Sequence, residues 1–104
     1  MRKVEQEMIR AFISGTSLRI ANDKVVTDGE NTKWYLHNNL IAEYIKEPYK
    51  TVNLYDAGWQ TNTTKSRLNA LLGWYVPGVR IHQKNYQWFV DGHKWFGSFT
   101  IENA

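Results

Sequence analysis

The 104-residue sequence predicts an α+β domain: a mainly antiparallel sheet of hairpins, one central helix packed on that sheet, and a short N-terminal helix. Three observations support this class. Apolar and polar residues alternate in short runs separated by turn signals, which is typical of β-hairpins. The segment Thr63–Leu72 instead has the apolar spacing of a helix. The length is that of one domain, so we expect a single unit over residues 1–104.

The N-terminal segment Arg2–Phe12 is expected to form a short amphipathic helix that ends at Gly15. A helix this short is marginal in isolation, so residues 1–15 must dock on the domain or fray. The apolar residues that share one helical face are Val4, Met8, Ala11 and Phe12.

Four strands are expected in the next part of the chain. The dipeptide Asn38-Asn39 is expected to form a two-residue hairpin turn, because Asn tolerates positive φ. That turn places Leu36 opposite Ile41. The same register pairs Trp34 with Glu43. The four expected strands are Lys24–Thr27, Thr32–His37, Leu40–Ile45 and Thr51–Tyr55.

The central helix is expected over Thr63–Leu72, with Asn62 or Thr63 as its N-cap and Gly73 just beyond its end. Its apolar stripe predicts the face that packs on the sheet. That stripe consists of Leu68, Leu71, Leu72 and Tyr75.

Three further strands follow, joined by turns at Lys84-Asn85 and Asp91-Gly92. These turns align Ile81, Trp88 and Trp95 across the three strands, which predicts a core layer. The opposite face is expected to carry Arg80, His82, Gln87 and Lys94, with Phe89 among them. The three strands are Val79–Gln83, Tyr86–Val90 and His93–Ile101.

The net charge is +3, from 13 basic and 10 acidic residues, and the positive excess is localised. No acid occurs between Asp56 and Asp91, and this block carries four basic residues: Lys65, Arg67, Arg80 and Lys84. The excess is modest for a dedicated nucleic-acid-binding protein, but it indicates where to look for a ligand.

The start of the central helix is the first candidate binding site. The hydroxyl groups of Thr63 and Thr64, free N–H groups and the cations Lys65 and Arg67 would together suit a phosphate, and Trp59 would stack on a base. The alternative is that the threonines cap the helix, the two cations are solvated and Trp59 belongs to the core.

The acid-free block contains a second candidate. Strand alternation places Arg80, His82 and Lys84 on one face, and Tyr86 lies in the same acid-free block. Basic groups interleaved with aromatic rings suit nucleic acid, because cations contact phosphates and rings stack on bases. The alternative is a solvated sheet face over an aromatic core.

No motif predicts an enzyme, a cofactor or a metal site. The three histidines show no metal-ligand spacing, and nucleophile and dinucleotide-binding motifs are absent from the sequence. No run of apolar residues is long enough for a transmembrane helix, so we expect no membrane partner.

The segment Gly58–Leu72, GWQTNTTKSRLNALL, resembles the hallmark of a family of small proteins encoded by tailed bacteriophages. The segments Tyr35–Ala42 and Gln83–Val90 are similar to that family as well, and the resemblance spans the chain from about Lys3 to Val90. The family has no established activity, so the resemblance implies a phage origin and a setting in the host cytoplasm but assigns no catalytic residue.

Two function classes compete most closely. The first is a non-enzymatic binding module for a phosphate-bearing ligand, most simply nucleic acid, using the cations and aromatic residues named above. The alternative is an accessory protein that inhibits a host protein through aromatic anchors, or that sequesters a nucleotide signal at the helix start. Self-assembly through sheet edges is a third possibility.

Overall fold

Two helices and nine strands form the chain in the computed structural model, which describes residues 2–104. The α+β class expected from the sequence is confirmed. The elements, in chain order, are α1 (Lys3–Ser14), β1 (Leu18–Ile20), β2 (Asp23–Thr27), β3 (Thr32–Leu36), β4 (Asn39–Ile45), β5 (Thr51–Tyr55), α2 (Asn62–Tyr75), β6 (Ile81–Lys84), β7 (Gln87–Val90), β8 (His93–Lys94) and β9 (Ser98–Ile101).

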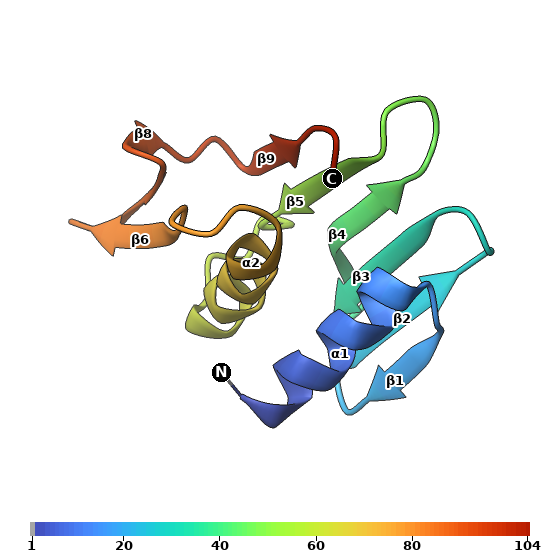
Figure 1. Ribbon diagram of the computed structural model, residues 1–104. Helices are drawn as coiled ribbons and strands as arrows, with labels where there is room; N and C mark the ends of the chain where they lie inside the picture. Colours follow the sequence, from blue (N-terminus) through green and yellow to red (C-terminus); the bar gives the residue numbers. More distant parts are fainter. Residues whose placement is uncertain (1) are drawn as a thin grey trace.

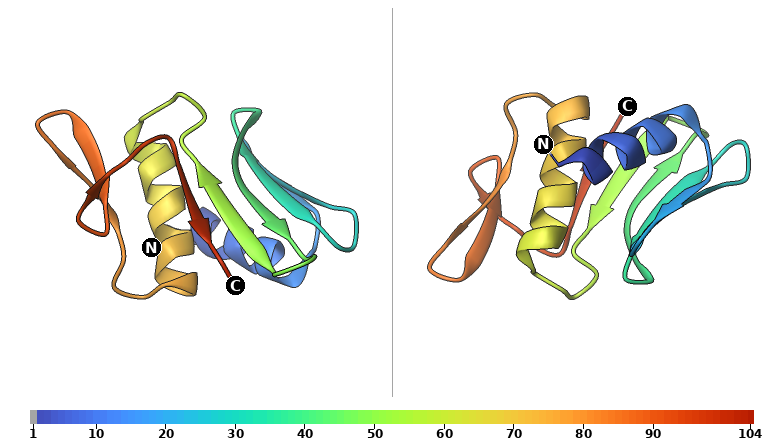
Figure 2. Two further views of the ribbon diagram at one scale, coloured as in Figure 1. Left: turned by 90° about the horizontal axis from the view of Figure 1, so that it is seen from above. Right: turned by 90° about the horizontal axis from the view of Figure 1, so that it is seen from below.

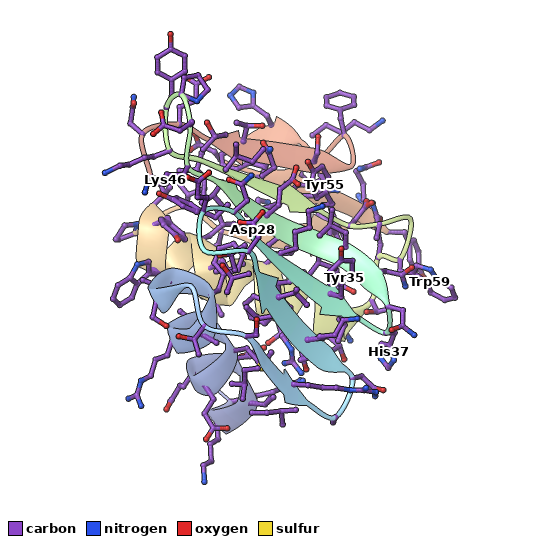
Figure 3. All side chains as sticks on the ribbon, turned by 90° about the vertical axis from the view of Figure 1, so that its right-hand side faces the viewer. Asp28, Tyr35, His37, Lys46, Tyr55 and Trp59 are labelled. Carbon is purple, nitrogen blue, oxygen red and sulfur yellow. The ribbon has the colours of Figure 1, made fainter. Side chains whose placement is uncertain are left out.

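The strands form two antiparallel sheets. The larger has the order β1-β2-β3-β4-β5-β9, and the smaller has the order β6-β7-β8. Both helices lie on the same face of the larger sheet (Figure 1). Helix α2 lies between the two sheets, so the smaller sheet projects from the far side of α2 (Figure 2). The other face of the larger sheet is uncovered (Figure 3).

The N-terminal helix docks on the larger sheet rather than fraying. Met8 and Phe12 are buried, and the Phe12 ring lies 6.2 Å from that of Trp34, centroid to centroid. Helix α1 ends at Gly15 as expected, because Gly15 adopts the left-handed conformation (φ 67°) that glycine tolerates.

The β3–β4 hairpin differs from the expected register. The turn is His37-Asn38, with φ of 51° and 65°, so Leu36 pairs with Asn39 and Trp34 with Ala42. A bulge leaves Ile41 without a residue opposite it. The bulge explains the shift, because it lets Ile41 as well as Ala42 reach the core.

Helix α2 is longer than expected at both ends. Thr61 is its N-cap, since the Thr61 hydroxyl accepts the Thr64 N–H at 3.1 Å. The helix continues through Gly73 and ends at Tyr75. Pro77 explains this end, because a proline disfavours helical backbone in the residue before it, here Val76. The expected apolar stripe is confirmed, with Leu68, Leu71 and Leu72 buried and Tyr75 partly buried.

The β6–β7 turn is Asn85-Tyr86, not Lys84-Asn85, and both residues have positive φ. This moves the register by two residues, so Ile81 pairs with Val90, while the faces remain as expected. The predicted core layer of Ile81, Trp88 and Trp95 is buried, with the two indole rings 6.0 Å apart. The Asp91-Gly92 turn is confirmed by the β7–β8 pairing.

The expected strand His93–Ile101 is broken into two. Strand β8 ends at Lys94, and Gly97 adopts a φ of 96° that redirects the chain. Strand β9 then joins the larger sheet beside β5, where Ile101 pairs with Val52. The C-terminal segment therefore connects the two sheets across the end of α2 (Figure 2).

Candidate functional site

Arg67 is not available to a ligand, which corrects its predicted role in phosphate binding. Its guanidinium binds both carboxylate oxygens of Asp23, each at 3.0 Å, and the Glu5 carboxylate at 2.7 Å. Asp23 also accepts the indole N–H of Trp34, and Glu5 accepts the Ser66 hydroxyl. Arg67 thus joins α1, α2 and β2 beneath the surface.

The surrounding charges balance this buried cation. Burial opposes the charged form of Arg67, but hydrogen bonds to Asp23 and Glu5 outweigh it and raise the pKa of Arg67. Burial likewise opposes ionisation of Glu5, but bonds from Ser66 and Arg67 lower the pKa of Glu5 below its usual value. Because the carboxylates of Glu5 and Asp23 already neutralise the Arg67 guanidinium, Arg67 does not bind a phosphate as well.

The start of α2 lies beside a cleft of about 480 Å³, and Trp59, Thr63 and Thr64 line it. Trp59 is 61% exposed, so it is not a core residue. Thr64 is buried, and its hydroxyl is bonded to Thr61. Neither Lys65 nor Arg67 lines the cleft, so the predicted grouping of threonines, cations and Trp59 does not form here.

Asp56 organises the loop beside this cleft. Its carboxylate accepts the Gly58 N–H at 2.9 Å, the Gln60 amide at 3.1 Å and the Trp95 indole N–H at 2.9 Å. Burial alone would raise its pKa, but these bonds prevail and the pKa of Asp56 lies below its usual value. Asp56 therefore has a structural role, because its carboxylate holds the loop after β5 and the Trp95 indole in place.

Lys65 and Arg80, two of the predicted phosphate ligands, lie at one hollow. It has a volume of about 570 Å³, and Asn62 and Ser66 also line it. Asn69 defines its edge, because its amide donates to the Ile81 carbonyl at 2.9 Å and accepts the Ile81 N–H at 2.7 Å. These bonds fix the start of β6 against α2 and keep Arg80 beside Lys65.

The outer face of the smaller sheet carries interleaved rings and cations. His82 pairs with Phe89, and Phe89 pairs with Lys94, so the three side chains form one row across β6, β7 and β8. The His82 and Phe89 rings stack at 5.6 Å, with an interplanar angle of 19°. The Lys94 ammonium lies 5.8 Å from the centroid of Phe96, a ring that is 81% exposed.

We call this face the hairpin platform, defined as His82, Lys84, Gln87, Phe89, Lys94 and Phe96. Lys84 pairs with Gln87 at its distal end, and Tyr86 in the adjoining turn is 93% exposed. Arg80, one residue before β6, links the platform to the hollow that Lys65 lines. The structure therefore groups Arg80, Lys84 and Tyr86 with the platform and separates them from Trp59.

Residues 2–104 contain no group of three or more His, Asp or Glu side chains placed to hold a metal ion. Neither helix in this range is both long and apolar enough to cross a bilayer.

The model of one protein family, described as Kyanoviridae Gp96 protein, matches residues 1–102. The chain belongs to this family. The expectation of a small tailed-phage protein is therefore confirmed for nearly the whole of this Gp96-family chain, and the family is one of cyanophage proteins. No curated protein and no solved structure matches the chain.

Proposed function

We propose that this Gp96-family protein binds single-stranded nucleic acid on the hairpin platform. The observation that supports it best is the cross-strand row of His82, Phe89 and Lys94, which continues onto the exposed Phe96 ring. Aromatic rings on an open sheet face stack on bases of any sequence, and neighbouring cations contact the backbone. In this arrangement the aromatic rings stack on the bases and Lys94 binds a phosphate.

The charge around the platform favours a polyanion. Lys84 and Lys94 lie on the platform and Arg80 adjoins it, and Asp91 is the only acidic residue between Asp56 and Glu102. Arg80 extends the positive surface to Lys65 in the hollow beside α2. A strand crossing the platform would thus meet cations at both ends.

The platform rings, half-buried Phe89 and exposed Phe96, favour a single strand over a duplex. In a duplex the bases are already stacked on one another, so Phe89 and Phe96 would gain no base contact. A single strand offers free base faces, and each stacked base contributes about 1–3 kcal/mol. The proposal therefore includes a preference for unpaired nucleic acid of either sugar type.

A salt titration tests the electrostatic part. The probe is a fluorescein-labelled DNA strand of about 16 nucleotides, with an RNA of the same sequence and the DNA duplex as further arms. Neutralisation of three phosphates by Arg80, Lys84 and Lys94 gives an expected slope of about −2 for log K against log salt. Lys84→Ala should reduce the magnitude of that slope by about 0.7, whereas Lys46→Ala, an exposed control outside the platform, should leave it unchanged.

A second matched pair tests stacking. Tyr86→Ala and Phe96→Ala should each weaken binding of the strand roughly fivefold or more. Tyr49, which is 69% exposed in the β4–β5 loop, provides the control, and Tyr49→Ala should not change the affinity. Absence of binding at low salt, or an equal loss with the control variants, would overturn the proposal.

A second candidate, binding of a host protein, is favoured by a different surface. The Trp74 ring is 60% exposed and lines a groove of about 290 Å³ between α1 and α2, together with Ile9 and Ala70. Exposed tryptophans next to apolar grooves are frequent anchors in protein interfaces. One stoichiometric host protein that survives nuclease treatment and is lost with Trp74→Ala would favour this function. Retention of that protein by the variant would exclude this groove.

A further inference from the structure

The cleft beside the start of α2 is separate from the hairpin platform. It is formed where the β3–β4 turn, the loop after β5 and the first turn of α2 meet. Figure 3 shows His37 and Trp59 projecting at the same corner of the molecule from two of these loops. Its volume of about 480 Å³ falls within the range of about 300–1,000 Å³ typical of small-molecule sites.

The apolar part of the cleft is suited to a flat ligand. Leu36 and Ile41 are 4% and 1% exposed, and both line the cleft from the core side. Trp59 provides an aromatic surface that the protein itself leaves largely uncovered. The aliphatic side chains of Leu36 and Ile41 lie next to the exposed indole of Trp59. This arrangement suits a planar ring, because one ligand can stack on the indole and bury its apolar surface against the aliphatic groups.

The polar groups of the cleft fall into two sets. Asp56, Thr61 and Thr64 are engaged in hydrogen bonds that hold the loop and cap the helix. Within residues 2–104, the side chains of His37, Asn39 and Thr63 make no hydrogen bond, although all three line the cleft. An imidazole, an amide and a hydroxyl at one rim can donate and accept hydrogen bonds along the edge of a heterocycle.

The charge of the cleft argues against a phosphate ligand. No Lys or Arg lines it, and its one acidic residue is the buried Asp56. The Thr61 hydroxyl already accepts the Thr64 N–H at the start of α2. An anion in the cleft would be repelled by the Asp56 carboxylate, and no cation compensates for this. An uncharged ring is not repelled.

We propose that this cleft binds an uncharged planar heterocycle of the nucleobase type. Trp59 stacks on the ring, Leu36 and Ile41 contact it, and His37, Asn39 and Thr63 bond its edge. The ligand is a free nucleoside or one base of a nucleic-acid strand. The proposal does not depend on strand binding at the hairpin platform, because the two surfaces share no residue.

Nuclear magnetic resonance titration with adenosine, cytidine, guanosine and uridine tests this assignment. At least one nucleoside should shift the indole N–H signal of Trp59 and the amide signal of Thr63. Trp59→Ala should weaken that binding roughly tenfold. Trp74→Ala, which removes an indole of nearly equal exposure, 60% against 61%, should leave the affinity unchanged.

A titration with adenosine monophosphate tests whether a phosphate group strengthens binding to the cleft. The monophosphate should bind no more tightly than adenosine, because the cleft provides no cation. Tighter binding of the monophosphate, an equal loss in both tryptophan variants, or no shift at Trp59 with any nucleoside would overturn the proposal.

The labelled DNA strand distinguishes the two sources of the base. If Trp59→Ala weakens both nucleoside and strand binding, the cleft takes a base of the strand. If it weakens nucleoside binding alone, the cleft takes a free nucleoside. Both results support a nucleobase site, and failure of strand binding at the platform would leave the nucleoside result unaffected.

Discussion

Replacing Arg67 by methionine should destabilise the protein far more than the same replacement of Lys65, a half-buried cation on the same helix. Methionine retains much of the apolar length of arginine, so the change chiefly removes the guanidinium. That group makes three hydrogen bonds, at 2.7, 3.0 and 3.0 Å, to carboxylates whose side chains are only 3% exposed. The variant therefore leaves Glu5 and Asp23 buried together without a counter-charge.

The expected loss follows from this geometry. Removing one partner of a buried ion pair costs about 3–5 kcal/mol of unfolding free energy. Trp34 and Ser66 still donate to the two carboxylates, which favours the lower part of that range. In the wild type the lowered pKa of Glu5 contributes stability at neutral pH, and this is lost as the pH falls through the folded-state pKa, below 4.5.

The difference in unfolding free energy between the variant and the wild type should also depend on pH. Without Arg67, Glu5 lies buried beside a second carboxylate with no counter-charge, which favours its protonated form. The difference from wild type should thus be greatest near neutral pH and shrink as the solution is acidified.

Urea denaturation followed by tryptophan fluorescence, at neutral and at acidic pH, measures both effects. Lys65→Met, two residues away on the same helix, is the matched control and should change stability by no more than about 0.5 kcal/mol. A loss for Arg67→Met as small as that of the control, or a deficit that grows on acidification, would refute the reasoning.

Further predictions concern two other sets of contacts. The pKa of Tyr55 is raised to about 12 by burial and by its hydrogen bond to Glu43. Glu43→Gln should lower it while Tyr75, also at about 12, stays unchanged in a tyrosinate absorbance titration. Asn69→Ala should cost about 1–2 kcal/mol of unfolding free energy, because it removes both bonds to Ile81 at the edge of β6. An unaltered denaturation midpoint would show that water replaces those bonds.

Periodicity predicted the elements better than it predicted their ends. The first hairpin turn that contains Asn begins one residue earlier than expected, and the second begins one residue later. His37 and Tyr86 each adopt a positive φ, which is rare for tyrosine. In the first hairpin, burial of Ile41 through a bulge decided the register. Gly97, with a φ of 96°, is the sequence signal for the break between β8 and β9 inside the expected strand His93–Ile101.

The role of Arg67 was the main misinterpretation at the candidate site, although a signal was available. Helical spacing places Arg67 on the same stripe as Thr64, Leu68 and Leu71, which faces the core. An arginine on such a stripe requires a buried acid, but its partners Glu5 and Asp23 are distant in sequence. Composition alone could not pair them, so the cation was counted as surface charge.

The face that became the hairpin platform was largely predictable. Strand alternation correctly placed His82 with Phe89 and Lys94, because a register error of two residues does not change faces. Phe96 was missed although a signal was available, because it lies two residues after Lys94 in the expected strand His93–Ile101 and alternation places both on one face.

Chemical-shift mapping with an unlabelled single-stranded DNA at low salt tests the central claim most directly. We predict that the largest amide shifts will occur at His82, Phe89 and Lys94 and extend to Arg80, while the open face of the larger sheet, marked by Tyr35 and Tyr55 in Figure 3, stays unchanged. No shifts at low salt, or shifts concentrated on that open face, would contradict the account.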